Sequence, residues 1–591
     1  MNKTDKIKAL YANRRGLKSP SKTKPMLTPS HKGKARLNGE HLRLVFPTDK
    51  TLISFVKKFD QKQFIKGDKN QVWEIPLSLD NINKLEQNGF ELSDKIKKWK
   101  CDLFAPVKFN PNFSVPNLKQ KLLPYQIEGV QIIEAKQGKV LLADDQGLGK
   151  TAQAIAWTAL HPEKKPVLII CPAMLKGNWE LELDFWLKNP KTQIITGTQK
   201  TPIWGEYVII NYDILTKKEG KENVIREELW NTKWKVLILD EAHYISNRQS
   251  IRGWAIEQLV KRIPHVIPIT ATPGKNRPKE IFTLINYVNP YLFPSFYRYA
   301  HRYCGPRKGF MGNWVFEGSS NEFELNDILS STIMIRRKKT EIFKELDKKI
   351  RQVIPIEINN RKEYDKADND FTSWVLENRP NSANKAFKAA ALYKFMLLEQ
   401  IAVEGKIKAC IEYLENLLET EEKVVAFAEH KVVIENLQKH FKNIAVVVDG
   451  STPPKQREEA KQLFQQCSRC KVRKEKHNFD KNACESFQYN MQKRLFISSS
   501  TGKEGNTLTA AYHVVFIELW WSPVDHDQAE DRVYGRAGDL HGGVMHYMIA
   551  KDTVEEHKAK IFDLKNEMLT KVLDGKGVSK EYILRELLKR R

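Results

Sequence analysis

Residues 141–160 read LLADDQGLGKTAQAIAWTAL. The mostly apolar run 138–143 predicts a short buried strand, and the alanine-rich residues after Thr151 have helical spacing. Between them stands the loop 147–151, Gly-Leu-Gly-Lys-Thr. A strand, a glycine loop and a helix in this order are typical of a phosphate-binding P-loop. The stretch therefore predicts a site for the phosphates of a nucleotide.

Each residue type in this loop suits phosphate chemistry. Gly147 and Gly149 let backbone N–H groups curl around phosphate oxygens, and the helix that follows offers its N-terminal dipole. Lys150 can reach the β- and γ-phosphates of ATP, and Thr151 supplies a hydroxyl for Mg²⁺. The full P-loop pattern wants a glycine where this chain has Asp144. The alternative is a tight glycine turn before an ordinary helix.

Length and charge narrow the class of protein. At 591 residues the chain is too long for one core, so three or four domains are expected, and 41% hydrophobic residues make most of it globular. The formal net charge of +26 favours a polyanionic partner such as DNA. Simple solubility, or attraction to an anionic membrane surface, is the alternative.

The sequence also indicates a compartment. No apolar run reaches the roughly 18 residues that a transmembrane helix needs, and no signal-peptide core opens the chain. Seven cysteines, an odd number and mostly scattered, argue against a disulfide framework and for a reducing environment. We therefore expect no membrane partner and a cytoplasmic or nucleoid-associated protein.

Further motifs extend the nucleotide interpretation. Gln126, in LLPYQIEGV, precedes the loop and carries an amide that could read the edge of adenine. VLILDEAH at 236–243 ends a predicted strand in two carboxylates. Asp240 can hold Mg²⁺ there and Glu241 can orient the attacking water, unless the strand ends in acidic residues by chance. A later strand ends in TAT at 270–272, small hydroxyl residues suited to coupling the nucleotide state to a second lobe.

These motifs carry a family resemblance. The chain resembles the first lobe of a superfamily-two helicase-type motor in the order and spacing of five motifs, PYQ, GLGKT, CPAMLKGNW, DEAH and TATP. Four further stretches are similar to the Swi/Snf-related group, and within it to the HARP/annealing-helicase branch. They are NRPKEIFTLINYVNP, HRYCGP, GSSNEFELNDIL and MIRRKKTEIFKEL. The resemblance spans about residues 41–565. It implies an α/β fold in which two RecA-like lobes, parallel sheets with helices on both faces, bind ATP in their cleft.

The resemblance extends through a second α/β lobe. The stretch 494–523 is similar to the family's motif V, from which Lys503 and Thr507 depart. QAEDRVYGRAGD at 528–539 is similar to the pattern Gln-x-x-Asp-Arg-x-x-Arg. Arg532 fits it as the arginine that neutralises charge on the γ-phosphoryl transition state. Gly535 stands where the second arginine belongs, so Arg536 depends on a local adjustment of one residue.

The other segments complete the expected organisation. Residues 1–38 hold eleven Lys/Arg and one acidic residue, and form either an arm that touches phosphates or a solvated tail. The segment after His41 resembles the small HARP module of annealing helicases, and Trp73 is expected in its core. The basic run 336–339 lies either near the nucleic-acid track or on a solvated helical face. The expected domains are the arm 1–40, the HARP-like module 41–100, the first lobe 110–290, a mostly helical insertion 291–404, the second lobe 405–570 and a helical tail 571–591.

One basic insertion, 467–484, does not belong to the usual motor. It contains a C-x2-C-x6-H-x6-C arrangement of three thiols and an imidazole, a donor set that suffices for a closed tetrahedral Zn²⁺ site. The alternative is a basic insertion with incidental cysteines. The four expected ligands are Cys467, Cys470, His477 and Cys484.

The sequence therefore predicts a DNA-dependent ATPase that translocates on double-stranded or forked DNA. The likeness to the HARP branch implies rewinding or fork remodelling rather than strand separation. An RNA helicase or a restriction-system motor is the alternative enzyme, and a DNA-clamping protein with a decayed ATPase is the alternative without activity. Its protein partners stay unknown.

Overall fold

The computed structural model describes residues 33–65, 70–219, 222–274, 277–309, 312–344, 349–378, 383–420, 423–465, 493–500, 508–534 and 542–559. The chain divides into two compact units, Met1–Ala105 and Pro106–Arg591. Among the helices described, none combines the length and the apolar character that a membrane crossing requires.

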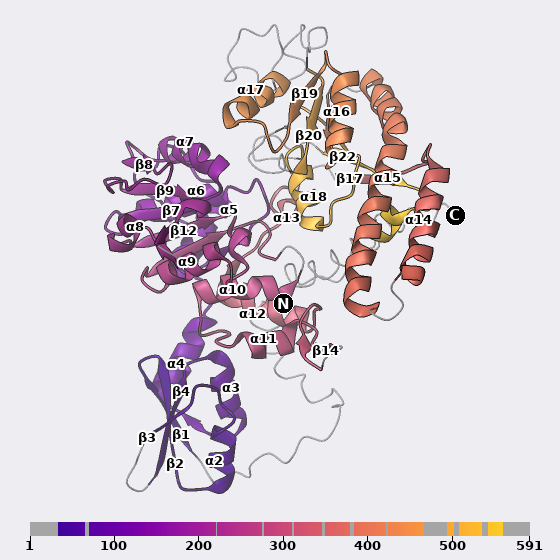
Figure 1. Cartoon of the computed structure of the whole chain (residues 1–591). Helices are drawn as coiled ribbons and strands as arrows, with labels where there is room; N and C mark the ends of the chain where they lie inside the picture. The colour runs from indigo at the N-terminus through magenta and orange to yellow at the C-terminus, as the bar shows by residue number, and fades with distance from the viewer. Residues whose placement is uncertain are drawn as a thin grey trace. The chain divides into compact units, whose positions relative to one another are not determined.

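The first unit is built on a five-stranded sheet of order β3-β4-β2-β1-β5 (Figure 1). Its strands are β1 (Lys34–Asn38), β2 (His41–Phe46), β3 (Gln63–Ile65), β4 (Gln71–Pro76) and β5 (Glu91–Leu92), and its helices are α2 (Lys50–Val56), α3 (Leu79–Gln87) and α4 (Asp94–Leu103). Alternation along β2 buries Leu42, Leu44 and Phe46. Trp73 is buried as expected, with its ring centroid 5.1 Å from that of Phe64.

Strand β1 differs from the sequence expectation. The basic arm was expected to reach residue 40, but Lys34–Asn38 pairs antiparallel with β2 and parallel with β5. The exposed Lys34 and Arg36 alternate with the buried Ala35 and the half-buried Leu37. A half-buried strand needs only this alternation, so the charge of its outer face hid it.

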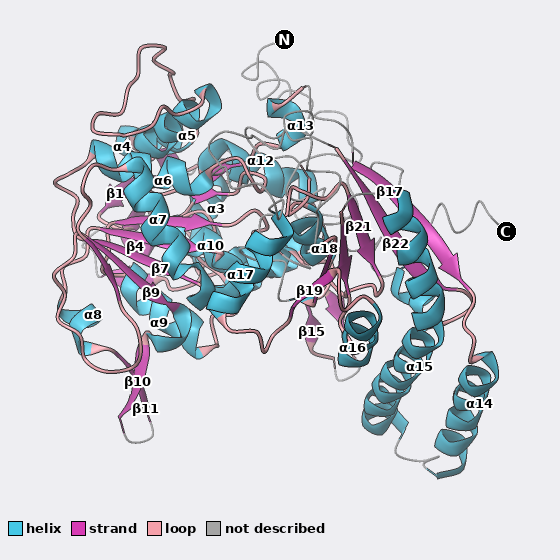
Figure 2. Ribbon diagram, turned by 90° about the horizontal axis from the view of Figure 1, so that it is seen from above, coloured by secondary structure: helices cyan, strands magenta, loops and turns pink. Residues whose placement is uncertain are grey.

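The first lobe of the second unit is a seven-stranded sheet of order β16-β6-β13-β12-β7-β9-β8, and every pairing is parallel. Its strands are β6 (Leu141–Leu142), β7 (Val167–Cys171), β8 (Thr192–Ile194), β9 (Tyr207–Asn211), β12 (Val236–Asp240), β13 (His265–Ile269) and β16 (Met334–Ile335). Its helices are α5 (Pro124–Ala135), α6 (Lys150–Leu160), α7 (Lys176–Trp186), α8 (Glu227–Asn231), α9 (Ile251–Val260) and α10 (Pro278–Val288). Figure 2 shows α6 and α7 on one face of this sheet and α9 on the other. A small hairpin, β10 (Thr216–Glu219) with β11 (Glu222–Ile225), is added to the lobe.

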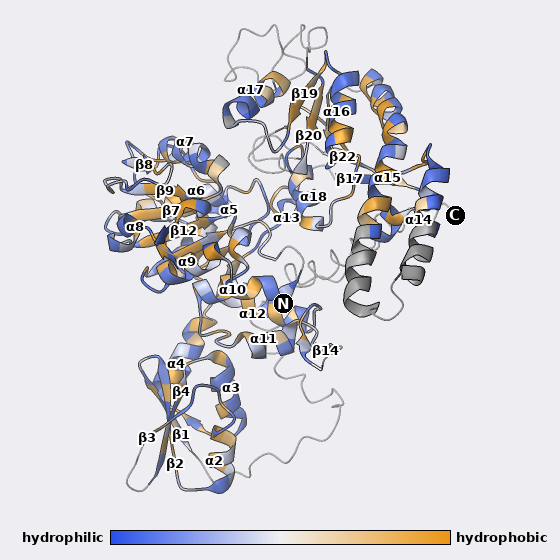
Figure 3. Ribbon diagram, in the orientation of Figure 1, coloured by the Kyte–Doolittle hydropathy of each residue, from blue (hydrophilic) through white to orange (hydrophobic). Residues whose placement is uncertain are grey.

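The central strands are mostly apolar, as parallel strands covered on both faces require, and β9 and β12 become polar only at their last residues, Asn211 and Asp240 (Figure 3). All five residues of β7 and of β9 are buried. The carboxyl ends of these parallel strands lie at one edge of the sheet, so β6 and β12 deliver the loops that follow them to the same edge.

The second lobe is a six-stranded parallel sheet of order β17-β22-β21-β18-β20-β19. Its strands are β17 (Lys349–Ile356), β18 (Val424–Phe427), β19 (Ala445–Val448), β20 (Leu495–Ser498), β21 (His513–Phe516) and β22 (Gly543–Ala550). Its helices are α14 (Arg361–Asn378), α15 (Ala383–Thr420), α16 (Lys431–His440), α17 (Pro454–Gln465) and α18 (Pro523–Glu530). Val425 and Phe427 enter one core cluster and Val424 and Ala426 another, so this sheet is also covered on both faces.

The stretch 291–404 contributes strands to both sheets. It contains α11 (Phe296–Tyr303), β14 (Arg307–Lys308), β15 (Trp314–Val315), α12 (Glu322–Thr332), β16, α13 (Lys339–Ile342), β17, α14 and the first part of α15. The sequence predicted a mostly helical insertion here, but β16 pairs with β6 and β17 pairs with β22 along eight residues. Strand β16 has two residues, too few to show a periodicity. In β17 the apolar residues do not mark the buried face, because Ile350 is exposed whereas Lys349 and Arg351 pair with the buried Glu530.

Candidate nucleotide site

The glycine loop joins β6 to α6 and uses both glycines for their backbone freedom. Gly147 has φ 84° and Gly149 has φ 67°, in the left-handed region that other residues rarely adopt. A Cβ added to Gly149 would lie 2.3 Å from the amide nitrogen Nε2 of Gln126. The strand, loop and helix that the sequence predicted are thus present, and the side chain of Gln126 packs on the loop.

Gln126 has a second contact that the sequence did not suggest. Its Oε1 accepts a hydrogen bond of 2.9 Å from the backbone N–H of Leu123, so its carbonyl caps the first turn of α5. The side chain is 5% exposed. Its role as a reader of adenine stays a prediction.

Lys150 begins α6 and turns back over the loop. Its ammonium donates to the carbonyl oxygens of Asp144 at 2.8 Å and Asp145 at 3.1 Å. Burial lowers the pKa of Lys150, and the carboxylates of Glu241, Asp144 and Asp145 oppose that shift. Thr151 follows in the first turn of the same helix.

Asp144, the departure from the P-loop pattern, is a fully buried partner of Arg337. The guanidinium of Arg337 donates to Asp144 through Nε at 3.0 Å and Nη2 at 2.5 Å, and its backbone N–H donates to the same carboxylate at 3.0 Å. Gln153 donates to Asp144 at 3.0 Å and accepts from Arg337 at 2.7 Å. Arg337 also donates to the carbonyl of Tyr125. The aspartate therefore ties the segment after β16 to the loop and to the start of α5.

The basic run 336–339 is accordingly an internal connector rather than a solvated helical face, and a place near the nucleic-acid track stays a prediction. Arg336 donates to the carbonyls of Ala143 at 2.8 Å and Ala271 at 2.9 Å and forms an ion pair with Asp145 at 3.0 Å. The side chains of Arg336 and Arg337 are only 13% and 15% exposed. A run of four cations indicated a surface because its carboxylate partners lie almost 200 positions earlier in the sequence.

Asp240 ends β12 at the edge that carries the loop. Its Oδ2 accepts from the indole N–H of Trp179 at 2.7 Å, and its backbone carbonyl accepts from the hydroxyl of Tyr212 at 2.8 Å. Burial and the neighbouring charge of Glu241 raise the pKa of Asp240. Lys150 opposes this shift only in part. A cation such as Mg²⁺ would stabilise the ionised form of this buried carboxylate. Sequence reasoning missed Trp179 and Tyr212, although Trp179 is the last residue of the motif CPAMLKGNW.

Glu241 has a left-handed backbone, with φ 48° and ψ 49°. Burial raises the pKa of its carboxyl, but His243, Lys150 and Arg532 oppose it and the net effect is a lowered pKa. His243 Nδ1 lies 3.1 Å from Glu241 Oε2 and 3.3 Å from Thr270 Oγ1. The strand end 240–241 is thereby connected to the threonine that follows β13.

Arg532 follows α18 of the second lobe and is 5% exposed. With the amide of Gln146 oriented to present its oxygen, Arg532 donates to Gln146 through Nη1 at 2.9 Å and Nη2 at 2.6 Å. Gln528, one turn earlier, donates to Thr272 at 3.3 Å. These contacts bring the predicted arginine to the loop and the helix before it to the TAT segment.

Buried ion pairs hold this end of α18. Asp531 lies 2.7 Å from the ammonium of Lys349 and 3.4 Å from that of Lys339. Glu530 accepts from Arg351 at 2.8 Å and 2.7 Å, and from the hydroxyl of Tyr547 at 2.6 Å. The aspartate that precedes Arg532 therefore fixes the backbone that carries the arginine.

Several predictions fall outside the described residues. They concern Arg536, residues 1–32 of the basic arm, the helical tail 571–591, and the four zinc ligands Cys467, Cys470, His477 and Cys484. Within the described ranges no group of three or more His, Cys, Asp or Glu side chains is arranged for a metal ion.

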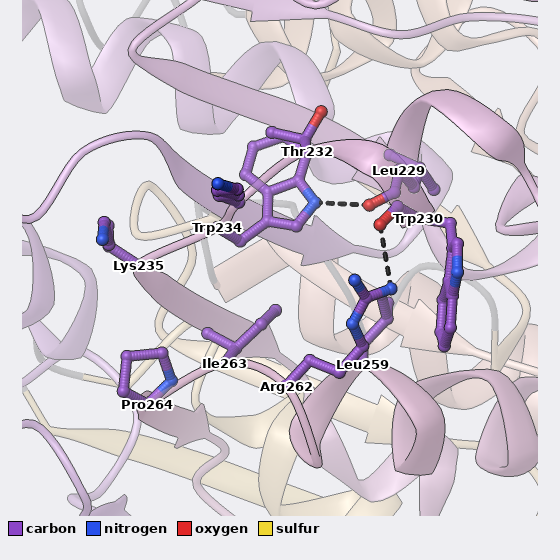
Figure 4. Close-up of a pocket in the computed structure, with 10 residues that line it drawn as sticks. Leu229, Trp230, Thr232, Trp234, Lys235, Leu259, Arg262, Ile263 and Pro264 are labelled. Atoms are coloured by element: carbon purple, nitrogen blue, oxygen red, sulfur yellow. Dashed lines mark hydrogen bonds between the residues drawn. The ribbon is translucent and has the colours of Figure 1, made fainter.

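A cavity of about 210 Å³ in the first lobe lies apart from these residues. Its lining includes residues just before β12 and β13, so it lies at the amino ends of strands whose carboxyl ends carry the loop. Figure 4 shows Arg262 donating to the carbonyl of Trp230 and Trp234 donating to that of Leu229, at 2.9 Å and 2.8 Å. The cavity is not part of the candidate nucleotide site.

The P-loop and the Asp-Glu end of β12 share one edge of the first sheet, and an arginine from the second parallel sheet meets them there. This arrangement defines a P-loop protein with two RecA-like lobes. Residues 125–405 match the family model of the SNF2-related domain. The chain belongs to the SNF2-related family.

Named relatives agree with this assignment. The chain is 31% identical over 446 residues to "SWI/SNF-related matrix-associated actin-dependent regulator of chromatin subfamily A-like protein 1" of Xenopus laevis, a match that covers 74% of this chain and 42% of the relative. It is 30% identical over 491 residues to "DNA annealing helicase and endonuclease ZRANB3" of Bos taurus, covering 79% of this chain and 42% of the relative. The chain thus spans less than half the length of these relatives.

A solved structure titled "Sulfolobus solfataricus SWI2/SNF2 ATPase core in complex with dsDNA" is 23% identical to this chain, with a TM-score of 0.36. The match covers 80% of this chain and 98% of that one.

Proposed function

We propose that the chain is a DNA-dependent ATPase that translocates on double-stranded or forked DNA. The observation that carries the proposal is the convergence of Lys150, Asp240 and Glu241 at one sheet edge with Arg532 from the second lobe. Phosphoryl transfer needs a cation that binds the phosphates, carboxylates that hold a metal and a water, and an arginine that stabilises the transition state. The net charge of +26 supports a polyanionic partner.

Each residue has one role in this proposal. Gly147, Gly149 and Lys150 bind the phosphates of ATP, and Thr151 with Asp240 would hold Mg²⁺, which neutralises phosphate charge when bound. Glu241, whose lowered pKa keeps it ionised, orients the attacking water. Arg532 stabilises the charge on the transferred phosphoryl group.

The contacts of Arg532 and Gln528 support a coupling between hydrolysis and movement. Both residues lie at the end of α18 and contact Gln146 and Thr272 of the first lobe. A change of nucleotide at the loop would alter these contacts, so the two sheets would shift relative to one another as ATP is bound and hydrolysed. On a DNA backbone, such a cycle yields directional steps.

We propose that the reaction rewinds or remodels forks, as the name "DNA annealing helicase" of one relative states for that protein. The test is ATP turnover with duplex, single-stranded, forked and RNA effectors at equal nucleotide concentration. We expect duplex and fork to stimulate hydrolysis and RNA to leave it near the basal rate. Stimulation by RNA alone would support an RNA helicase, and no turnover with any effector would support a DNA-clamping protein.

Lys150→Ala is the control that connects turnover to the loop. It should abolish hydrolysis and leave DNA binding largely intact, because Lys150 contacts the loop rather than an outer surface. Hydrolysis at the wild-type rate by this variant would show that the phosphate site has been misplaced.

We also propose that Cys467, Cys470, His477 and Cys484 bind one structural Zn²⁺ ion. The support is their clustering within eighteen positions of a basic segment that has few apolar residues, so metal binding would supply its folding energy. Metal analysis of protein purified under reducing conditions without chelator should give about one zinc per chain. A stoichiometry near zero would leave a basic insertion with incidental cysteines.

A further inference from the structure

An aromatic surface lies on α11 and on the hairpin of β14 and β15, apart from the candidate nucleotide site. We call it the aromatic platform and define it by Phe296, Tyr297, His301, Trp314 and Phe316. Tyr297 is 55% exposed, Phe296 43% and Trp314 42%. Large side chains of this kind are usually buried, and three on neighbouring elements make a contiguous patch.

The platform is rigid because its rings support one another. The ring of His301 has its centroid 4.4 Å from that of Tyr297, 4.5 Å from that of Trp314 and 5.0 Å from that of Phe316. Phe296 packs in turn against Phe316 at 6.3 Å. Within the described residues His301 Nε2 has no hydrogen-bond partner, so this ring contributes packing rather than polar contacts.

The hairpin places a cation beside the exposed indole. Lys308 and Trp314 are directly opposite in the antiparallel register of β14 and β15, so their side chains share one face. Arg307 and Lys308 are both exposed, and neither forms an ion pair within the part of the chain that the structure describes.

Two acidic side chains nearby are paired with cations. Glu317, next to Phe316, pairs with Arg277 and Lys279. Glu324 of α12 pairs with Arg302 and accepts a hydrogen bond of 2.9 Å from the hydroxyl of Tyr303. Lys308 therefore leaves a positive charge on the face of Trp314, and this charge complements an anion. Arg307, opposite Val315, faces the other side of the hairpin.

We propose that the aromatic platform binds unpaired bases of single-stranded DNA. This inference rests on the proposed function and names the part of a fork that this surface would contact. Bases expose their flat faces only when they are unpaired, and exposed aromatic rings next to lysine and arginine bind such bases by stacking while the cations contact the phosphates. Base pairs inside a duplex offer no free face, so duplex binding would depend on other surfaces.

The test compares alanine variants with a matched control in the full-length protein. Tyr297→Ala and Trp314→Ala each remove an exposed ring, whereas Trp204→Ala removes an aromatic side chain that is 65% exposed and lies between β8 and β9. Affinity is measured without ATP for a dT oligonucleotide of about 20 nucleotides and for a blunt duplex. Each platform variant should weaken single-strand binding about tenfold, because the loss of one stacked base has roughly that effect. Duplex binding and the Trp204→Ala protein should stay within about twofold of the wild type.

A conservative variant separates stacking from folding. Trp314→Phe keeps a ring and should restore most of the single-strand affinity. If Trp314→Ala lowers the thermal midpoint, Tyr297→Ala still decides the question, because its ring is more than half exposed. Unchanged single-strand affinity in Tyr297→Ala, or an equal loss for single strand and duplex, overturns the proposal. This binding assay needs no hydrolysis, so its failure is distinct from a failure of DNA to stimulate ATP turnover.

Discussion

The carboxylate of Glu241 illustrates how single residues set the chemistry of the site. It combines a lowered pKa with a place beside Lys150 and His243.

We expect Glu241→Gln to bind ATP and to reduce turnover by about 10²-fold or more, because the amide cannot accept a proton from water. ATP binding is measured with a fluorescent analogue and turnover by phosphate release. Glu134→Gln, in α5, is the matched control and should retain full turnover, since Glu134 pairs with His161. A Glu241→Gln protein of normal rate would remove Glu241 from the reaction.

Arg532 permits a prediction at the same scale. Arg532→Ala should lower turnover on the order of 10³-fold with little change in ATP affinity, as for other arginines that act on a transferred phosphoryl group. Arg532→Lys should not restore the rate, because an ammonium cannot reproduce the planar fork that contacts Gln146 through two nitrogens. Steady-state kinetics of the two variants, with Arg536→Ala beside them, show whether one arginine or two contribute. Equal rates for Arg532→Lys and the wild type would reduce the role of Arg532 to simple charge.

The loop between β6 and α6 shows what an element gains by departing from its family pattern. Asp144→Gly would restore the glycine that the P-loop pattern expects, yet it would leave the buried guanidinium of Arg337 without its carboxylate. Breaking a buried pair by removing one partner costs about 3–5 kcal/mol. We therefore expect Asp144→Gly to lower the thermal midpoint of unfolding and the rate of ATP turnover together.

The double variant provides the control for this prediction. Asp144→Gly with Arg337→Ala should be less destabilised than the sum of the two single changes, because the second change removes the charge that the first one isolates. Calorimetry of the four proteins measures this coupling. Additive effects would mean that Asp144 and Arg337 act independently.

The elements also show what the sequence could predict. Gly147, Gly149 and Lys150 are neighbours in the chain, and residues that share a short segment reveal a strand, loop and helix by their spacing alone. Arg532 was found because a family pattern names it. The Asp144–Arg337 pair could not be predicted, since its partners are separated by 193 positions and meet only because β16 pairs with β6. Trp179 was hidden for the same reason, because its hydrogen bond to Asp240 depends on the neighbouring position of β7 and β12.

At the scale of the whole molecule, buried histidines make folding stability depend on pH. Burial lowers the pKa of His526 to about 3 and that of His546 to about 4. An unfolded chain protonates histidine near pH 6.5, so between about pH 6.5 and 4 the unfolded state binds protons that the folded state does not. Stability therefore falls as the pH falls through this window, by about 2–3 kcal/mol for each histidine at pH 4.5.

Thermal unfolding at pH 7.5 and pH 5 measures this effect. We expect His526→Gln to show a smaller drop in midpoint than the wild type, because glutamine can still accept the hydrogen bond from the backbone N–H of Trp520 and does not titrate. His440→Gln, at a side chain that is 43% exposed, should match the wild type. An identical drop in all three proteins would assign the pH dependence to other groups.

The left-handed backbone of Glu241 has a consequence for anyone who would engineer this protein. A side chain with a Cβ is strained at φ 48°; glycine at that position would remove the strain, and asparagine tolerates this conformation better than glutamate does. A library of variants selected for heat resistance alone should therefore enrich Glu241→Gly and Glu241→Asn, and the enriched proteins should have lost ATP turnover. Sequencing such a library before and after selection, next to a library selected for turnover, would show opposite preferences at this one codon.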